Sequence, residues 1–96
     1  MEITKMLTMS TMHIKESTAE LLNKEPETNT LGLCVYPKCD FGYYITIDEY
    51  AVKQASEEEF PEDLSNLIIF AHDLDCKTLC LDCDAEVIPY LNKYDW

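Results

Sequence analysis

Three acidic residues near the end of the chain have the spacing at which a strand could present a cation site. Asp82, Asp84 and Glu86 stand at i, i+2 and i+4, so a continuous strand would place them on one face. Carboxylate oxygens are the ligands that hard cations prefer. A two-metal nuclease centre would also need carboxylates from other segments and a basic residue for the phosphate. A solvated strand face is the simpler interpretation, and a metal-dependent enzyme stays open as a separate class.

The cysteines and histidines do not match a known metal motif. Three, three and two residues separate His72, Cys76, Cys80 and Cys83, and four separate Cys34 from Cys39. Structural zinc sites use paired short spacings that differ from these. Two interpretations remain: reduced cysteines that pack as small hydrophobes, and a local site made by His72, Cys76 and Cys80.

No set of residues predicts an enzyme or a cofactor site. His13 stands beside Ser10 and Thr11 as a turn residue, and no serine or cysteine nucleophile has a recognisable partner. Two glycines in the whole chain are too few for a glycine-rich phosphate loop. We therefore expect a non-enzymatic protein whose histidines make structural hydrogen bonds.

The strongest compositional signal is acidity. Nineteen carboxylates face seven lysines and no arginine, which gives a formal charge of −12 over 96 residues. A nucleic-acid binder needs a basic face to release counterions, so direct binding to DNA, RNA or an anionic membrane is not expected. The natural complement is a basic protein, for example one that itself handles nucleic acid.

The length and the N-terminus suggest a cytoplasmic protein of one domain, residues 1–96. No apolar run is long enough to span a bilayer, and residues 1–5 lack a basic region followed by an apolar stretch. The five cysteines are then expected to be reduced thiols.

Hydrophobic periodicity predicts strands over 3–9, 31–36, 43–48 and 78–83, and helices over 16–24 and 61–75. Pro26 is expected to end the first helix. Residues 49–60 have no clean period and are interpreted as a long connection. The order of elements is that of a ferredoxin-like βαββαβ sandwich, an α+β fold. It predicts a four-stranded antiparallel sheet in the order 4-1-3-2, with two helices on one face.

This topology would gather many acids at the end of the molecule where the first strand starts, densest over 57–63. The alternative is that acids at helix starts act as caps and that the others keep the protein soluble. Twelve of the nineteen carboxylates would lie at that end: Glu2, Glu25, Glu27, Asp48, Glu49, Glu57, Glu58, Glu59, Glu62, Asp63, Asp84 and Glu86.

Several short motifs recur together in a known family. They are STMHI at 10–14, FGYY at 41–44, PEDL at 61–64, CKTLCLDCD at 76–84 and the end Tyr94-Asp95-Trp96. Nearly the whole chain resembles a family of small uncharacterised bacterial proteins found on plasmids, phages and integrative elements. The resemblance brings no catalytic residues. It implies a setting in which small acidic proteins often disarm host defence.

These observations lead to one functional expectation and one alternative. The expectation is a non-enzymatic inhibitor that blocks a basic CRISPR effector or restriction enzyme, by DNA mimicry or by covering a nuclease. The apolar tail, which includes Tyr90, Tyr94 and Trp96, would pack on the domain or anchor the partner. The alternative is a regulatory or antitoxin-like module that binds through the open face of the sheet. The predicted contact residues are Glu57, Glu58, Glu59, Glu62, Asp63, Asp84, Glu86 and Trp96.

Overall fold

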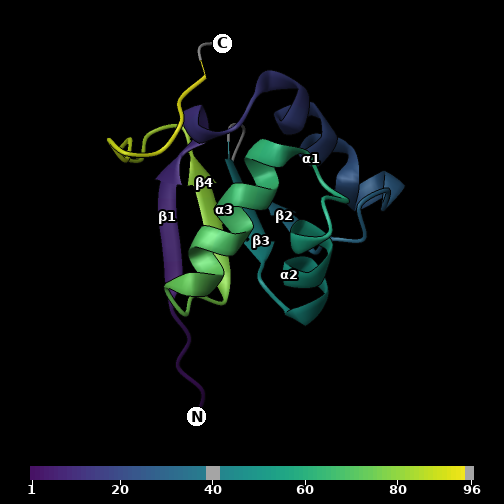
Figure 1. The fold of residues 1–96 in the computed structure, drawn as a ribbon, viewed down its shortest axis with the longest axis vertical. Coiled ribbons are helices and arrows are strands. Elements are labelled where there is room, and N and C mark those ends of the chain that lie inside the picture. The colour runs from purple at the N-terminus through teal and green to yellow at the C-terminus, as the bar shows by residue number, and fades with distance from the viewer. Residues whose placement is uncertain (39–41, 95–96) are drawn as a thin grey trace.

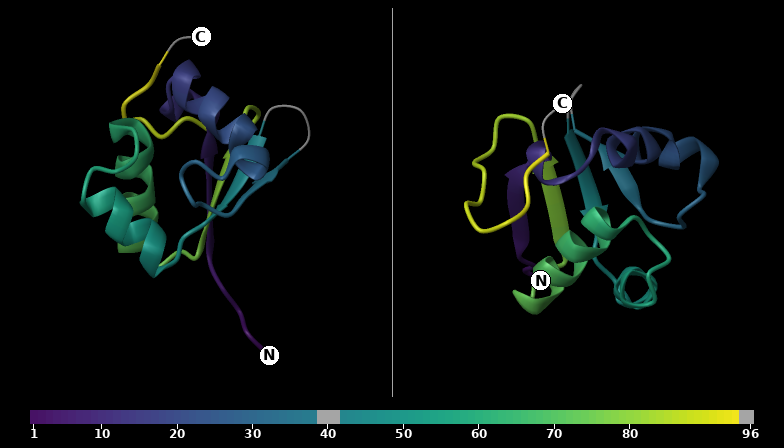
Figure 2. Two further views of the ribbon diagram at one scale, coloured as in Figure 1. Left: turned by 90° about the vertical axis from the view of Figure 1, so that its right-hand side faces the viewer. Right: turned by 45° about the horizontal axis from the view of Figure 1, so that its top comes forward.

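A computed structural model gives the fold and describes residues 1–38 and 42–94. One sheet carries its helices on a single face, so the chain is α+β as the sequence predicted (Figures 1 and 2). Both predicted helices and all four predicted strands are present with shifted bounds, and one more α-helix joins them. The elements in chain order are β1 (Met6–Ser10), η1 (Thr11–His13), α1 (Glu16–Thr28), β2 (Val35–Pro37), β3 (Gly42–Thr46), α2 (Glu49–Ser56), α3 (Glu62–Asp73) and β4 (Thr78–Asp82).

The strand order corrects the predicted ferredoxin-like topology. The order is β1-β4-β3-β2, with β1 parallel to β4 and the other two pairs antiparallel. The first and last strands are neighbours, and β2 and β3 pair as the predicted hairpin. The predicted order 4-1-3-2 and the wholly antiparallel sheet are wrong, because β4 lies between β1 and β3 and runs in the direction of β1.

The missed helix α2 explains the reversed direction of β4. Residues 49–60 are not an irregular connection, since Glu49–Ser56 form α2 and Asp48 caps it by accepting from the Ala51 N–H at 2.8 Å. Helices α2 and α3 therefore carry the chain away from one end of the sheet and back again. Thr46 at the end of β3 pairs with Thr78 at the start of β4. A single helix would have delivered the chain to the other end.

The first helix continues past its expected end. Helix α1 runs through Pro26 to Thr28, and Asn29 closes it in a left-handed conformation with φ 49° while donating its N–H to the Glu25 carbonyl. The Glu25 side chain is 2% exposed and accepts hydrogen bonds from the backbone N–H groups of Leu31 and Leu33. These bonds hold the turn after α1 in place and outweigh the tendency of proline to end a helix.

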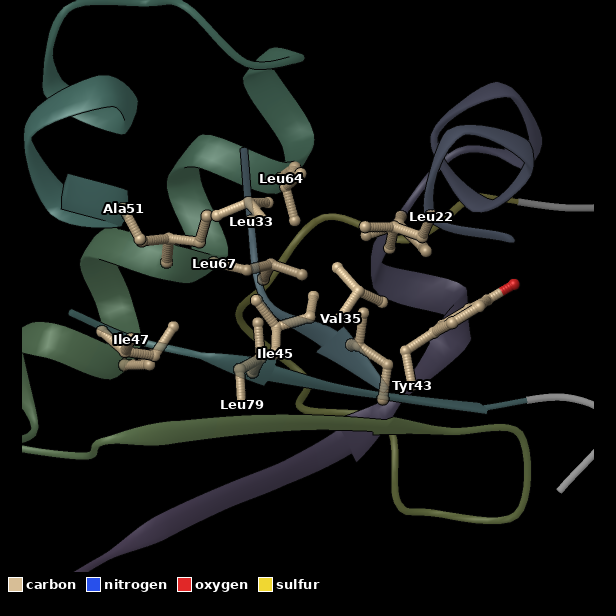
Figure 3. Close-up of a cluster of buried hydrophobic side chains, with 14 of the residues drawn as sticks. Leu22, Leu33, Val35, Tyr43, Ile45, Ile47, Ala51, Leu64, Leu67 and Leu79 are labelled. Atoms are coloured by element: carbon tan, nitrogen blue, oxygen red, sulfur yellow. The ribbon is translucent and has the colours of Figure 1, made fainter. Parts of the chain in front are cut away.

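The core lies between the sheet and the helices (Figure 3). Val35, Ile45 and Leu79 pair side by side across β2, β3 and β4 and are 6%, 0% and 0% exposed. Leu22 of α1 and Leu64 of α3 cover them from above. Each such side chain contributes roughly 1.5–3 kcal/mol when buried, so this layer accounts for much of the stability of the domain.

The opposite face of the sheet carries no helix of the described chain (Figure 2). Thr8, Cys80, Tyr44 and Tyr36 pair in register across the four strands, so their side chains form one row on this face. Tyr36 is 61% exposed at the edge. We call this surface the open sheet face.

The C-terminal segment packs on the domain as far as residue 94. His13 is 2% exposed and bonds the segment twice: Nε2 accepts from the Ile88 N–H at 2.9 Å, and Nδ1 donates to the Asn92 carbonyl at 2.7 Å. Tyr94 also donates its N–H to the Met12 carbonyl at 2.8 Å. Trp96 lies outside the described residues. None of the described helices has the length and apolar character to cross a bilayer.

Candidate functional site

The acids do not gather at one end of the molecule. Because β4 runs parallel to β1, Asp84 and Glu86 lie beside the end of β1 and not beside its start. Accordingly, Ser10 at the end of β1 donates its N–H to the Glu86 carbonyl. Asp48 follows the end of β3, at the opposite end of the sheet. The prediction that twelve carboxylates gather at the end where β1 starts is therefore wrong. It failed for the same reason as the predicted sheet order, because the direction of β4 was predicted incorrectly.

Asp63, predicted as a contact residue, is a buried structural group. Its side chain is 5% exposed at the start of α3. One carboxylate oxygen accepts from the Lys15 N–H at 2.8 Å and the other from the Thr18 hydroxyl at 2.9 Å. Asp63 ties α3 to the start of α1, and its burial and its two internal hydrogen bonds contradict its assignment as an exposed contact residue.

Four exposed glutamates lie close together in the chain between the end of α2 and the start of α3: Glu57, Glu58, Glu59 and Glu62. Glu57 donates its N–H to the Lys53 carbonyl and Glu59 donates to the Gln54 carbonyl, so the chain turns tightly after α2. Glu58 lies in the left-handed region with φ 60°. Such a conformation is uncommon for a residue with a side chain, and here it lets the turn carry three consecutive carboxylates.

A groove lies at this turn, between the end of α2 and the first turns of α3. Its volume is about 470 Å³, within the range of roughly 300–1,000 Å³ that is usual for ligand sites. We call it the α2–α3 groove, and none of its lining residues, all within the described chain, is basic. It is lined by Ala55, Ser56, Glu58, Phe60, Glu62, Ser65, Asn66 and Ile69.

The groove combines an apolar floor with polar walls. Ala55 and Phe60 are 3% and 6% exposed, so they form part of the core surface beneath it. Glu58 and Glu62 are exposed, and their carboxylates make no hydrogen bond or ion pair with any residue in 1–38 or 42–94. Unpaired carboxylates above an apolar floor can accept a long cationic side chain, whose methylene groups and charged end need different surroundings.

The second acidic cluster lies where β4 ends. Ligand atoms of Asp82, Cys83 and Asp84 lie within 4.8 Å of one another. The Lys38 ammonium forms an ion pair with Asp82, and the Asp84 N–H donates to Asp82 Oδ1 at 3.0 Å. Glu86 is not a member of the cluster, because β4 ends at Asp82 and the strand alternation predicted for these acids stops there.

Charges in this cluster work against a metal site or a reactive thiol. The hydrogen bond from Lys38 holds the pKa of Asp82 below its usual value, and the same bond raises the pKa of Lys38. Partial desolvation, together with the charges of Asp84 and Asp82, raises the pKa of the Cys83 thiol. A cation would have to compete with Lys38, and the raised pKa disfavours the reactive thiolate form of Cys83.

The other predicted metal ligands do not converge. Within the described chain, His72, Cys76 and Cys80 form no group of ligand atoms within 4.8 Å of one another. Cys76 is buried and Cys80 is 0% exposed in the sheet, in agreement with the interpretation as small hydrophobes. Cys39 lies outside the described residues.

Sequence reasoning missed the groove and the identity of the partners of His13. The groove was missed because its wall, α2, was not predicted, although the cap Asp48 and the i, i+4 pair Ala51 and Ala55 were signals of a helix. The role of His13 was predicted only as a structural hydrogen bond. Its two partners, Ile88 and Asn92, are more than seventy residues away, and no local pattern indicates them.

These features define a small acidic α+β domain with a mixed sheet and a carboxylate-rimmed groove. Residues 6–96 match the family of unknown function described as the DUF5983 C-terminal domain, and the chain belongs to this family. No curated protein and no solved structure matches the chain. The predicted membership of an uncharacterised family is thus confirmed.

Proposed function

We propose that this protein is a non-enzymatic inhibitor from a plasmid, phage or integrative element that blocks a basic, nucleic-acid-handling defence protein such as a CRISPR effector or restriction enzyme. The observation that carries the proposal is the set of unpaired carboxylates at the α2–α3 groove, on a chain with a formal charge of −12 and no arginine. The tail ending in Tyr94-Asp95-Trp96 belongs to the proposal as a family feature, with Trp96 as an outer contact.

Electrostatics explains how such a protein would find its target. A surface of like charge steers an oppositely charged partner toward it, and the effect weakens as salt shortens the Debye length from about 10 Å at 0.1 M to about 3 Å at 1 M. Glu57, Glu58, Glu59 and Glu62 are the proposed central contacts. Asp84 and Glu86, both exposed, are proposed as peripheral contacts.

The test is protection of an invading DNA in cells that carry a defence system. A plasmid targeted by a restriction or CRISPR system is introduced into cells with and without this protein, across a panel of such systems. We expect the wild-type protein to raise the transformation efficiency and the E57K/E58K/E59K variant to lose this effect. A variant with the same change of net charge at exposed sites elsewhere, E20K/E27K/D73K, should keep it.

The proposal fails if no system in the panel is inhibited, or if the two variants protect equally. It also fails if the purified protein binds DNA, or if its complex with the inhibited enzyme resists molar salt. Circular dichroism of each variant checks that the fold is intact.

The open sheet face supports a second candidate, a regulatory or antitoxin-like interaction module. Tyr36 and Tyr44 are adjacent across β2 and β3, Tyr36 is 61% exposed, and Met6 at the other edge is 51% exposed. Exposed aromatic residues on a flat sheet are common anchors of protein interfaces. Under this candidate Y36K abolishes partner binding and the groove variants do not.

A further inference from the structure

We propose that the α2–α3 groove binds a single arginine side chain from the basic partner. This inference rests on the proposed function for the existence of such a partner, and it adds the binding mode. A flat acidic surface would be contacted by any cation, whereas a groove with a defined floor and walls selects the shape of the group that enters it.

The floor of the groove suits the apolar part of the arginine side chain. Phe60 and Ala55 are almost fully buried, and Ile69 on α3 is half-buried beside them. The methylene groups of arginine pack well on such surfaces while the charged end stays near solvent. Phe60 is among the lining residues, and an aromatic ring is a favourable neighbour for a guanidinium group.

The walls supply acceptors for the charged end. Glu58 and Glu62 offer two unpaired carboxylates at the mouth, and the side chains of Ser56 and Asn66 have no hydrogen-bond partner among the described residues. Ser65 is already engaged, since its hydroxyl donates to the Phe60 carbonyl at 3.4 Å. A guanidinium group has five N–H donors in a fixed plane and needs several acceptors at once, which an ammonium group does not.

The same groove is a poor site for a metal ion. The described chain places no three ligand atoms of His, Cys, Asp or Glu within 4.8 Å of one another at the groove. A divalent cation would lack ligands there, whereas a guanidinium group can span separated carboxylates. Lys53 on α2 is the nearest cation in sequence, and it is not among the lining residues.

A peptide titration followed by NMR tests the inference directly. The probe is a short glycine peptide that carries one arginine, compared with matched peptides that carry lysine or the uncharged isostere citrulline. We expect the arginine peptide to shift the amide signals of Ser65, Asn66 and Ile69, and the citrulline peptide to bind at least about tenfold more weakly. Equal binding of arginine and citrulline would overturn the inference.

Variants that change only the shape of the groove or only its charge test the two contributions to binding separately. Ser56→Trp fills the groove and keeps every carboxylate, and Ser17→Trp places the same side chain on an exposed site of α1. We expect S56W to lose peptide binding and S17W to keep it. The double variant E58Q/E62Q keeps the shape and removes the charge, and it should also lose binding. Binding by S56W at the wild-type level would contradict the proposed mode.

The plasmid-protection assay then distinguishes the two proposals. If E57K/E58K/E59K loses protection while S56W protects as the wild type does, the acidic inhibitor stands and the arginine groove fails. If both variants protect as the wild type does, both proposals fail. Loss of protection in S56W, with S17W unaffected, supports both.

Discussion

Two groups of carboxylates in this small domain have opposite roles. Glu25 and Asp63 are 2% and 5% exposed, and their oxygens accept hydrogen bonds from backbone N–H groups and a hydroxyl. Glu58 and Glu62 are exposed beside a groove, and their carboxylates have no partner in the described chain. Net charge alone therefore does not identify a functional acid, because some of the acidic side chains, such as Glu25 and Asp63, hold the fold together.

The side chains of the two buried acids are satisfied because fixed donors of the protein replace water around their oxygens. A buried charge without partners is strongly unfavourable, and one that is fully hydrogen-bonded links the segments that donate to it. Glu25 links the end of α1 to the segment before β2, and Asp63 links α3 to the start of α1. Removing either side chain should therefore destabilise the fold, whereas removing the carboxylate of a groove glutamate should weaken binding without destabilising the fold.

The largest expected effect is from Glu25→Ala. The change leaves the N–H groups of Leu31 and Leu33 without their acceptor, and we expect a loss of about 3 kcal/mol in the free energy of unfolding. Urea denaturation measures this loss. The exposed neighbour Glu27→Ala should change the free energy by less than about 0.5 kcal/mol, and equal losses in the two variants would contradict the structural role of Glu25.

Asp63→Ala should cost about 2 kcal/mol, because it removes the acceptor of the Lys15 N–H and of the Thr18 hydroxyl. A double-mutant cycle with Thr18→Val isolates the side-chain pair. The coupling energy should be about 1 kcal/mol, and additive effects of the two substitutions would show that the pair contributes nothing. Groove-dependent binding should be unchanged in the folded fraction.

His13→Leu should release the C-terminal segment at a cost of about 1–2 kcal/mol. The neutral imidazole must carry its proton on Nδ1, since the Asn92 carbonyl only accepts and the Ile88 N–H only donates. Amide hydrogen exchange at Ile88 should become faster in the variant. The exposed His72→Leu is the control, and unchanged protection at Ile88 in H13L would rule out this role.

Glu58→Gly should stabilise the protein by about 0.5–1 kcal/mol. Glycine adopts the left-handed conformation without the steric cost that a side chain carries there. Thermal denaturation measures the gain, with Glu57→Gly as the control that should lose stability. If Glu58 is retained for binding, the stabilised variant should bind the arginine peptide more weakly.

The smallest expected effect concerns the partly exposed pair of Lys38 and Asp82. The pKa of Asp82 is lowered in the folded protein, so the pair stabilises the fold above the unfolded pKa, and this stabilisation is lost as the pH falls through the folded pKa. An NMR titration of the Asp82 carboxyl group should show the lowered pKa in the wild type. Lys38→Met should raise this pKa toward the ordinary value, with the hydrogen bond from the Asp84 N–H as the remaining lowering cause, and an unchanged pKa would disprove the attribution to Lys38.

The periodicity of the chain was enough to predict α3, the hairpin of β2 and β3, and the α+β class. It failed at α2, whose buried residues Ala51 and Ala55 are small and give a weak apolar pattern between charged neighbours. It also failed at Pro26, where the N–H groups of Leu31 and Leu33 donate to the Glu25 side chain and hold the turn that follows the helix. In both places, contacts between segments outweigh the local preference.

Acidity, the absence of arginine and most of the elements follow from the residues alone, because charge and hydrophobic period are local properties of the chain. Which carboxylates face solvent, and whether a groove lies beside them, depends on the direction of β4 and on the packing of α2 against α3. The eight-residue helix α2, which the sequence did not predict, sets the direction of β4 and so the end of the sheet at which the residues after β4 lie. For that reason only the tertiary structure distinguishes Asp63, which holds the fold, from its neighbour Glu62, which is free to bind.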